Sequence, residues 1–242
     1  MELYKRGVRY VKFKTKGKTK RERKLITIYS PKSPISESFR TLRTNIQFAS
    51  IDQSLKTLMV TSTGPGEGKS TIIANLAVVL AQQEKKVLLV DADMRKPTVH
   101  HTFRLPNLVG LTNVLVGNEV LEDAIQETTV NNLNILTSGP IPPNPAELLG
   151  SNRMSQLVDE VSSTYDIVLF DAPPVIAVTD AQVLSRIIDG VLLVVHSGKT
   201  HREMAIKSKE LLENVRANVI GVVLNHKEVK GENYYYYYYG EN

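Results

Sequence analysis

Cysteine is absent from this chain of 242 residues. Its absence excludes disulfide bonds, zinc sites built on thiolates and iron–sulfur clusters held by cysteine. A chain without cysteine is compatible with a reducing compartment such as the cytoplasm, where disulfides are rare.

Long hydrophobic runs are also missing. The apolar stretch Ser70–Gln83 is only 14 residues long and contains Asn75, whereas a membrane-spanning helix needs about 20 predominantly apolar residues. The first residues are charged and lack the apolar centre of a secretory signal. We therefore expect neither a membrane span nor a signal peptide.

Positive charge is concentrated near the first residue. Residues 1–24 hold eleven Lys or Arg and two Glu, although the whole chain carries a net charge of only +5. We expect this basic tail to lie outside the folded domain, where it could be disordered or could bind an anionic membrane surface or an acidic partner. No nucleic acid partner is expected, because no aromatic-interleaved basic surface continues into the domain.

The remaining pattern predicts an α/β fold. A hydrophobic content of 42% supports one domain over residues 25–226, followed by a tyrosine-rich tail at 227–242. After a strand that begins near Leu58, apolar strands are expected at Val87–Val90, Ile167–Phe170, Val191–Val195 and Val219–Leu224. Helical stretches lie around Met154–Val161 and Glu203–Val215. Such alternation is typical of a doubly wound, mostly parallel sheet with helices on both faces, whose ligand lies at the carboxyl ends of the strands.

Three further segments are assigned from local sequence. Residues 24–29 are expected to form a short edge strand, and residues 35–49 an amphipathic helix with Ser33 or Ser36 as its N-cap. The loop at residues 139–145 reads GPIPPNP and leads into a helix at Ala146. We interpret that loop as a rigid connector, with a place at the active-site edge as the alternative.

One segment carries the strongest functional signal. Directly after the first apolar strand, residues 63–71 read TGPGEGKST and open an apolar helix. This context is typical of a P-loop, in which freed backbone N–H groups cradle phosphates, Lys69 reaches the terminal phosphates and the Ser70 hydroxyl binds magnesium. Thr63 stands where the pattern has glycine, but Gly64 and Gly66 still supply a tight turn. The sequence therefore predicts a P-loop NTPase fold that binds a nucleoside triphosphate with Mg²⁺.

Three carboxylates end two of the predicted strands. Asp91 and Asp93 close the segment VLLVDAD, and Asp171 closes IVLFD. One strand-end carboxylate suffices to hold magnesium, and Asp171 fills that Walker B position. Another aspartate could accept the proton of an incoming hydroxyl, or Asp91 or Asp93 could instead cap the following segment. Arg95 and Lys96 could stabilise phosphate charge or pair with these carboxylates.

Two more features complete a recognisable set. The helix at 35–49 contains Glu37-x-x-Arg40-x-x-Arg43, and residues 234–239 are six consecutive tyrosines. Together with the P-loop, VLLVDADMRKP and IVLFDAPP, they resemble the bacterial tyrosine kinases, or BY-kinases, that accompany capsule and exopolysaccharide synthesis. The resemblance covers roughly residues 35–239. It is to the Gram-positive type, in which the cytoplasmic kinase is a separate chain from its membrane activator.

The resemblance implies a function. It implies an ATP-dependent protein-tyrosine kinase that phosphorylates the tail of a neighbouring subunit in a homo-oligomeric ring, besides other protein substrates. Activation would come from the cytoplasmic end of a transmembrane activator of the polysaccharide co-polymerase type. The kinase would therefore be cytoplasmic and recruited to the inner face of the membrane by that partner.

The resemblance also implies roles for individual residues. The catalytic residues would be Lys69, Asp91 as the base, and Asp93; the metal ligands would be Ser70, Asp93 and Asp171. The nucleotide-binding residues would be Gly64, Gly66, Glu67, Gly68, Lys69, Ser70, Thr71 and Asn225, with capping as the alternative role for Asn225. The phosphoacceptors would be Tyr234, Tyr235, Tyr236, Tyr237, Tyr238 and Tyr239, and the subunit contacts Glu37, Arg40 and Arg43.

Two other functions remain open at this point. An ATPase switch of the cell-division or plasmid-partition type shares such a sheet, but its signature lysine corresponds to Gly64 here, and it gives no reason for the tyrosine run. A non-catalytic regulator that binds ATP for a membrane polysaccharide complex would use the same P-loop. A eukaryotic-type kinase is not supported, because no His-Arg-Asp or Asp-Phe-Gly motif occurs.

Overall fold

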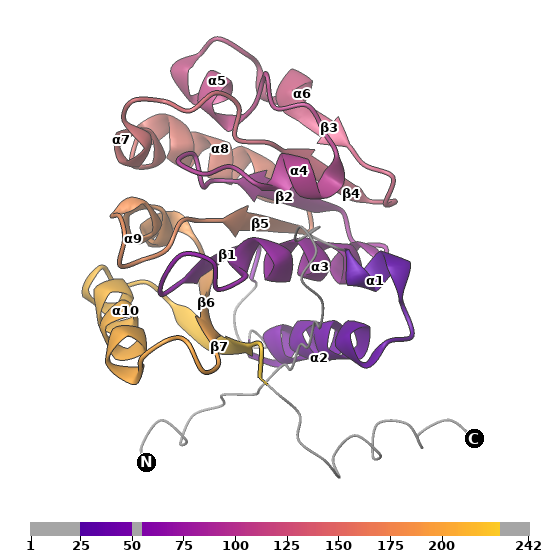
Figure 1. Ribbon diagram of the computed structural model, residues 1–242. Helices are drawn as coiled ribbons and strands as arrows, with labels where there is room; N and C mark the ends of the chain where they lie inside the picture. Colours follow the sequence, from indigo (N-terminus) through magenta and orange to yellow (C-terminus); the bar gives the residue numbers. More distant parts are fainter. Residues whose placement is uncertain (1–24, 50–54, 228–242) are drawn as a thin grey trace.

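The computed structural model of the protein describes residues 25–49 and 55–227 (Figure 1). The basic tail, the tyrosine run and the predicted domain limits at 24 and 227 are therefore not tested by it. Seven strands form one sheet in the order β3-β4-β2-β5-β1-β6-β7. Their bounds are β1 Thr57–Ser62, β2 Val87–Asp91, β3 Ile125–Glu127, β4 Leu133–Leu136, β5 Ile167–Asp171, β6 Gly190–His196 and β7 Val219–Asn225.

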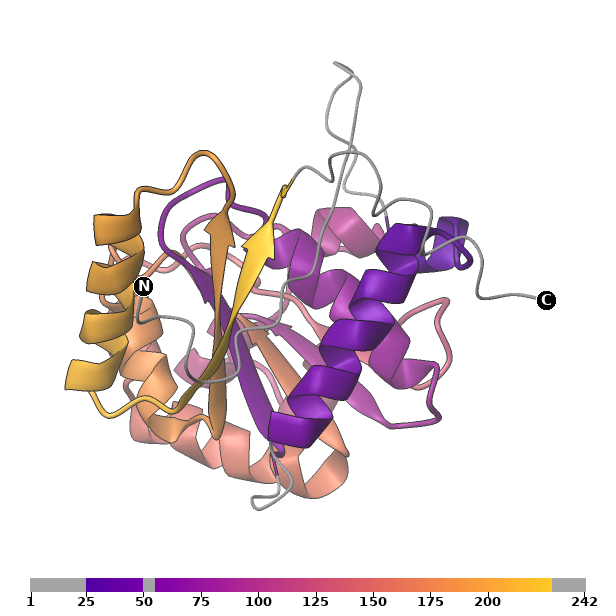
Figure 2. The same ribbon diagram turned by 90° about the horizontal axis from the view of Figure 1, so that it is seen from below.

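Helices cover both faces of this sheet. Their bounds are α1 Ile26–Tyr29, α2 Pro34–Ala49, α3 Lys69–Ala81, α4 Val99–Phe103, α5 Leu111–Val116, α6 Leu121–Ala124, α7 Pro145–Leu149, α8 Asn152–Thr164, α9 Asp180–Leu184 and α10 Arg202–Asn214. Figure 2 shows α2 on one side of the sheet and α8 and α10 on the other. Every strand pair is parallel except β3–β4, so the predicted doubly wound, mostly parallel fold is confirmed.

The predicted edge strand at residues 24–29 is wrong. This segment forms the single helical turn α1, whose Thr27 is buried against α3. The backbone N–H and the hydroxyl of Thr27 both donate to Asn75 Oδ1, at 3.1 and 2.9 Å. A polar anchor on a distant helix therefore overrides the strand preference of the β-branched residues in ITIY.

Two strands were not predicted. β3 is three residues long and partly exposed, and β4 has four residues with Asn134 among its apolar side chains. Neither segment is long enough to produce a clear apolar run. By contrast, the helix expected at 35–49 is present as α2, and Ser33 is its N-cap because its Oγ accepts the N–H of Ser36 at 3.2 Å.

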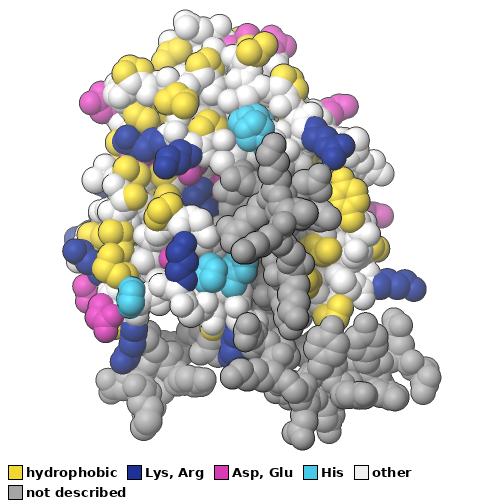
Figure 3. All heavy atoms as spheres, viewed as in Figure 1, with side chains coloured by type: hydrophobic (Ala, Val, Ile, Leu, Met, Phe, Trp, Pro, Cys, Tyr) yellow, Lys and Arg dark blue, Asp and Glu magenta, His cyan; other side chains and the backbone are white. Residues whose placement is uncertain are grey.

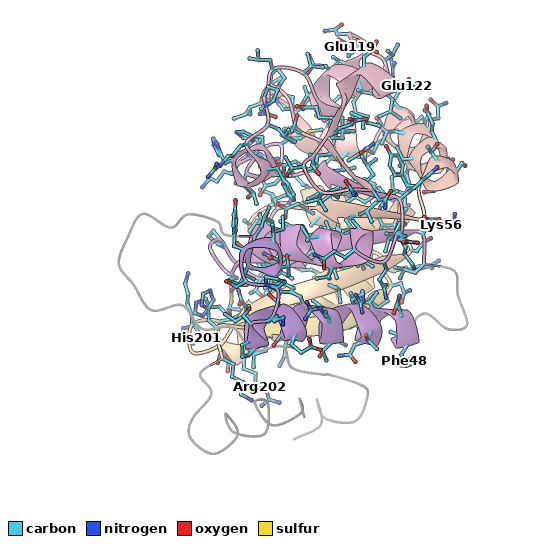
Figure 4. The ribbon with its side chains drawn as sticks, turned by 90° about the vertical axis from the view of Figure 1, so that its right-hand side faces the viewer. Phe48, Lys56, Glu119, Glu122, His201 and Arg202 are labelled. Carbon is cyan, nitrogen blue, oxygen red and sulfur yellow. The ribbon has the colours of Figure 1, made fainter. Side chains whose placement is uncertain are left out.

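The parallel strands give the sheet two unlike edges. Lys56 immediately precedes β1, and His201 follows β6, so the two residues mark the amino and carboxyl edges, on opposite sides of the view in Figure 4. The turn between β1 and α3 leaves from the carboxyl edge, as do the ends of β2 and β5. Within residues 25–49 and 55–227, no helix combines the length and apolar character needed to cross a bilayer.

Candidate active site

The P-loop lies between β1 and α3, as predicted. Gly66 and Gly68 have φ angles of +76° and +96°, in the left-handed region that favours glycine. A Cβ atom on Gly68 would also collide with the side-chain amide of Asn225. α3 begins at Lys69, so the backbone N–H groups of its first turn have no partner within the helix. This arrangement is suited to binding phosphate.

Three residues brace the P-loop from within the chain. The Glu67 carboxylate is buried; Oε2 accepts the N–H of Thr63 at 2.9 Å and Oε1 accepts the hydroxyl of Thr200. The side-chain amide of Asn225 donates to the Glu67 carbonyl oxygen at 2.8 Å. Glu67 and Asn225, both expected to bind nucleotide, thus hold the loop's own backbone. Thr200 was missed, because nothing in its local sequence links it to a loop more than 130 residues away.

Lys69 is the centre of a buried charge cluster. Its Nζ lies 2.8 Å from Asp93 Oδ2 and 3.1 Å from Asp171 Oδ1, and it is 3.3 Å from the Ser70 hydroxyl oxygen. Burial lowers the pKa of Lys69, but the carboxylates of Asp171 and Asp93 outweigh that effect and raise it above the ordinary value. The lysine is therefore charged at neutral pH. The structure brings together Lys69, Ser70, Asp93 and Asp171, four residues predicted from separate motifs.

Asp171 fits a place in a magnesium site. Its side chain is fully buried, and its Oδ2 has no hydrogen-bond partner in the described part of the chain. Burial raises the pKa of Asp171, whereas Lys69 and the Ser70 hydroxyl oppose that rise. An unsatisfied carboxylate oxygen and a serine hydroxyl are hard oxygen ligands of the type that Mg²⁺ prefers. No group of three or more His, Asp or Glu residues is arranged to hold a metal among the described residues. Shared coordination with nucleotide phosphates is the usual arrangement for Mg²⁺ in such sites.

Asp91 caps the segment that follows it, the alternative weighed from the sequence. Its Oδ2 accepts the N–H groups of Thr98 and Val99 at 2.8 and 2.9 Å, at the start of α4. Its Oδ1 accepts a single long bond from the N–H of Asp93, at 3.3 Å. Burial, together with the charge of Asp171, raises the pKa of Asp91 to about 7 although those backbone N–H groups oppose it. A pKa in this range is suited to a general base.

Arg95 does not pair with the three clustered aspartates. Its guanidinium makes two bonds to Asp180, from Nε at 2.9 Å and from Nη2 at 3.0 Å, and the Asp180 carboxylate is fully buried. The side-chain bond to Asp180 raises the pKa of Arg95 further above its ordinary value. This bidentate pair ties the segment after β2 to α9 across the end of β5. It therefore fixes the segment that carries Asp93.

The remaining predicted residues lie away from the charge cluster or at its rim. Thr71 is in the first turn of α3 and Gly64 is at the beginning of the P-loop turn. On α2, Arg40 pairs with Glu37 at 2.7 Å on the surface, whereas Arg43 donates to the Val79 carbonyl oxygen of α3 at 3.1 Å. The first pair is accessible to a neighbouring subunit. Arg43 is partly engaged in holding α2 to α3, and its subunit contact stays a prediction.

Comparison with known proteins places this site in a family. The sequence matches the AAA domain family over residues 55–218. It is 53% identical over 214 residues to "Tyrosine-protein kinase YwqD" of Bacillus subtilis (strain 168), covering 88% of this chain and 90% of that protein. It is 44% identical over 212 residues to "Putative tyrosine-protein kinase CapB" of Staphylococcus aureus, covering 88% of this chain and 93% of that protein.

A solved structure agrees with these matches. The chimerical protein CapA2B2 superposes with a TM-score of 0.82 at 47% identity, covering 85% of this chain and 90% of that one. The fold, the P-loop with its strand-end aspartates and the sequence identity over most of both chains agree. The chain belongs to the bacterial tyrosine-protein kinases.

Proposed function

We propose that this protein transfers the γ-phosphoryl group of ATP to tyrosines of its own run, Tyr234–Tyr239, chiefly between subunits, and so regulates capsular or exopolysaccharide synthesis. The observation that carries the proposal is the buried cluster of Lys69, Asp93 and Asp171 beside the P-loop, with Asp91 at its margin. The six tyrosines supply acceptors within the same chain.

Phosphate binding is the role of the P-loop and Lys69. The N–H groups at the start of α3 and the charged Nζ of Lys69 would stabilise negative charge on the transferred group. Lys69 now contacts Asp93 and Asp171, so its charge is held inside the site before nucleotide arrives. Ser70, Asp93 and Asp171 would hold Mg²⁺, which when bound neutralises charge on the β- and γ-phosphates.

Proton removal is the role assigned to Asp91. Its Oδ2 is occupied by two backbone N–H groups, whereas Oδ1 takes only one long bond. Oδ1 is therefore the oxygen that would accept the proton of the acceptor tyrosine. The tyrosine oxygen would bond to the γ-phosphorus as the bond from that phosphorus to the β–γ bridging oxygen breaks and ADP leaves. A base with a pKa near the working pH combines adequate basicity with a substantial deprotonated population.

The partners follow from the family resemblance. A transmembrane activator of the polysaccharide co-polymerase type would bind the kinase and recruit it from the cytoplasm to the inner face of the membrane. The exposed Glu37–Arg40 pair on α2 supports a contact between subunits of a ring, because both side chains are accessible in a single chain.

Transfer of labelled γ-phosphate from ATP with magnesium tests the proposal. The panel comprises the wild type, Lys69→Ala, Asp91→Asn and a variant with Phe at all six positions of the run, each with and without an activating membrane-protein fragment. Lys209→Ala and Asp159→Asn are matched controls on exposed surfaces of α10 and α8. We expect label on tyrosine in the wild type and both controls, and its loss in the other three variants.

Two results would contradict the proposal. Label on tyrosine that persists in the Phe variant would place the main acceptor outside the run. Bound ATP without any phosphotyrosine, even with the activator, would favour the second candidate, a non-catalytic regulator. That candidate remains because the same loop serves phosphate binding and phosphoryl transfer.

A further inference from the structure

A second lysine lies against the P-loop, from the turn that follows β6. Lys199 is exposed, and its Nζ makes a long hydrogen bond of 3.4 Å to the Pro65 carbonyl oxygen. A Cβ atom on Gly66 would lie 3.7 Å from the same Nζ. Pro65 and Gly66 form the exposed tip of the P-loop, whereas Lys69 is buried. The P-loop thus has a lysine on its exposed side that the proposed chemistry does not use.

The backbone that carries Lys199 is fixed beside the P-loop. The N–H groups of Lys199 and Thr200 both donate to the His196 carbonyl oxygen, at 3.2 and 2.9 Å, which closes a tight turn at the end of β6. The Thr200 hydroxyl accepts the N–H of His196 at 2.9 Å and donates to Glu67 of the P-loop. Lys199 therefore stays next to the loop, while its flexible four-carbon stem lets the ammonium group change its partner.

The charge of Lys199 is available to a ligand. Among the residues that the structure describes, the ion pairs involve other cations, and none includes Lys199. Figure 4 places His201, two positions further on, at the carboxyl edge, and Figure 3 shows Lys or Arg and His side chains side by side over the ends of β6 and β7. An ammonium group without a carboxylate partner, beside a loop suited to phosphate, favours an anionic ligand.

The buried part of the site is rich in acidic groups. Lys69 pairs with Asp93 and Asp171, and Asp91 is close enough to raise the pKa of that lysine further. Nucleotide phosphates would bring several more negative charges to the same place. Mg²⁺ and Lys69 would offset part of that charge, and a further cation on the exposed side of the P-loop would offset more of it.

We propose that Lys199 is a second phosphate-binding lysine, which leaves the Pro65 carbonyl oxygen and contacts the phosphate chain when ATP binds. This inference rests on the proposed function, because it takes ATP as the ligand. The exchange is favourable, since a 3.4 Å bond to a neutral carbonyl oxygen is weak and a bond from an ammonium group to a phosphate oxygen is charge-assisted. Lys199 transfers no proton; it holds the nucleotide while the bond from the γ-phosphorus to the β–γ bridging oxygen breaks.

Calorimetric titration with ADP and with the non-hydrolysable ATP analogue AMP-PNP, each with magnesium, tests the contact. Lys199→Met removes the charge but keeps a long side chain, and Lys199→Arg keeps the charge. We expect Lys199→Met to bind both nucleotides about tenfold more weakly at low salt, and Lys199→Arg to bind them within about twofold of the wild type. Lys207→Met, at an exposed position of α10, is the matched control and should bind as the wild type does. Unchanged affinity of Lys199→Met for both nucleotides would overturn the inference.

Two further comparisons separate a phosphate contact from mere support of the P-loop. Lys199→Gln keeps a donor that can bond the Pro65 carbonyl oxygen but has no charge, so it should bind nucleotide as weakly as Lys199→Met. The advantage of the wild type should also shrink to less than about threefold at about 1 M salt, where the Debye length is about 3 Å. Wild-type affinity in Lys199→Gln would show that Lys199 only supports the loop and would overturn the inference, as would a tenfold advantage that persists at high salt.

Kinetics separate this inference from the proposed function. The enzyme is the full chain with Ala at positions 234–239, and the acceptor is the tail peptide, residues 227–242. Lys199→Met should raise KM for ATP about tenfold and leave KM for the tail peptide unchanged. Transfer by the wild type together with an unchanged KM for ATP in Lys199→Met would overturn the inference alone. Absence of transfer by any variant, with nucleotide affinity still dependent on the charge at position 199, would overturn the proposed function alone.

Discussion

The two flanks of the carboxyl edge are built in opposite ways. On the flank of β1, β6 and β7, buried polar side chains such as Glu67 and Asn225 hold the P-loop backbone. On the flank of β4, backbone bonds hold two loops whose side chains, Leu108 and Ile141, point their apolar surface to solvent. The first flank, with its P-loop, is suited to a charged nucleotide. The second presents apolar side chains to solvent, and the aspartates that end β2 and β5 lie between the two.

The largest loss of activity is expected from a substitution in the buried cluster of Lys69, Asp93 and Asp171, which lies between the two flanks. Lys69→Ala should reduce phosphoryl transfer by at least about 10³-fold, because it removes the cation that we propose stabilises the phosphates. It also leaves Asp93 and Asp171 unpaired in a buried site, which should lower the free energy of unfolding by about 3 kcal/mol. Urea denaturation and single-turnover kinetics measure the two effects. Equal free energies of unfolding for Lys69→Ala and Lys209→Ala would show that the buried pairs contribute nothing to the stability of the fold.

Asp91 should give the reaction its dependence on pH. Because its pKa is raised to about 7 and the base must be deprotonated, kcat/KM should rise about tenfold per pH unit below pH 7 and level off above it. Asp91→Asn should lower the rate by about 10²-fold and abolish that rising limb. Asp159→Asn should retain the limb. A wild-type profile that is flat between pH 6 and pH 8 would exclude Asp91 as the base.

Loss of the hydrogen bond between Thr200 and Glu67 should raise KM for ATP more than KM for the acceptor peptide. Thr200→Val removes the hydroxyl that donates to Glu67 Oε1 and accepts the N–H of His196, while keeping the shape of the side chain. We expect the lost bond to Glu67 to raise KM for ATP about fivefold to tenfold, equivalent to about 1–1.5 kcal/mol, with KM for the tail peptide unchanged. Thr102→Val, on α4, is the control. A larger rise in KM for the peptide than for ATP would contradict the division between the flanks.

The Arg95–Asp180 pair should act on stability. Arg95→Ala leaves the buried Asp180 carboxylate without its bidentate partner and should lower the free energy of unfolding by about 1–3 kcal/mol. The free energy of unfolding of Arg95→Lys should lie between those of the wild type and Arg95→Ala, because an ammonium group keeps the charge but not the fork geometry. Urea denaturation measures the series. Equal stability of the Ala and Lys variants would mean that charge at this position is unimportant.

The smallest change in the free energy of unfolding is expected from a substitution on α2. Arg40→Ala removes a surface pair with Glu37 and a bond to the Pro31 carbonyl oxygen, and should change the free energy of unfolding by less than about 1 kcal/mol. If this pair contacts a neighbouring subunit, the mass of the assembly in analytical ultracentrifugation should nevertheless fall. Lys209→Ala breaks a comparable exposed pair on α10 and should leave the mass unchanged. An unchanged mass for Arg40→Ala would remove α2 from the subunit contact.

Local signals predicted the residues that the structure brings together at the carboxyl edge. The P-loop, Asp91, Asp93 and Asp171 each follow an apolar strand, and parallel strands bring their carboxyl ends together at one edge. The strand order itself and the register between β2 and β5, which places Asp91 beside Asp171, required the structure. Long apolar strands were recognised, whereas β3 and β4 were too short to produce a period, and β3 is partly exposed.

Supporting residues could not be found in the same way. Thr200, Asp180 and Asn107 act through partners far away in the sequence, so no spacing marks them. The helical turn α1 was predicted as a strand from its β-branched residues. Its helical conformation depends on the bonds of Thr27 to Asn75, a residue 48 positions away that no local pattern reveals. The connector at 139–145 was interpreted as structural, with the active-site edge as the alternative; the parallel register of β2 and β4 brings the chain after Leu136 to the carboxyl edge of the sheet, and Gly139 bonds Asn107 there.

The fate of the γ-phosphate in one wild-type sample tests the proposed kinase most directly. The chain is incubated with labelled ATP, magnesium and the activating fragment, and phosphotyrosine in residues 234–239 is measured alongside inorganic phosphate. A kinase predicts that labelled tyrosine accounts for most of the phosphate transferred before the run is saturated. Release of inorganic phosphate from the start, with no label in the run, would contradict it and would identify the site as that of an ATPase.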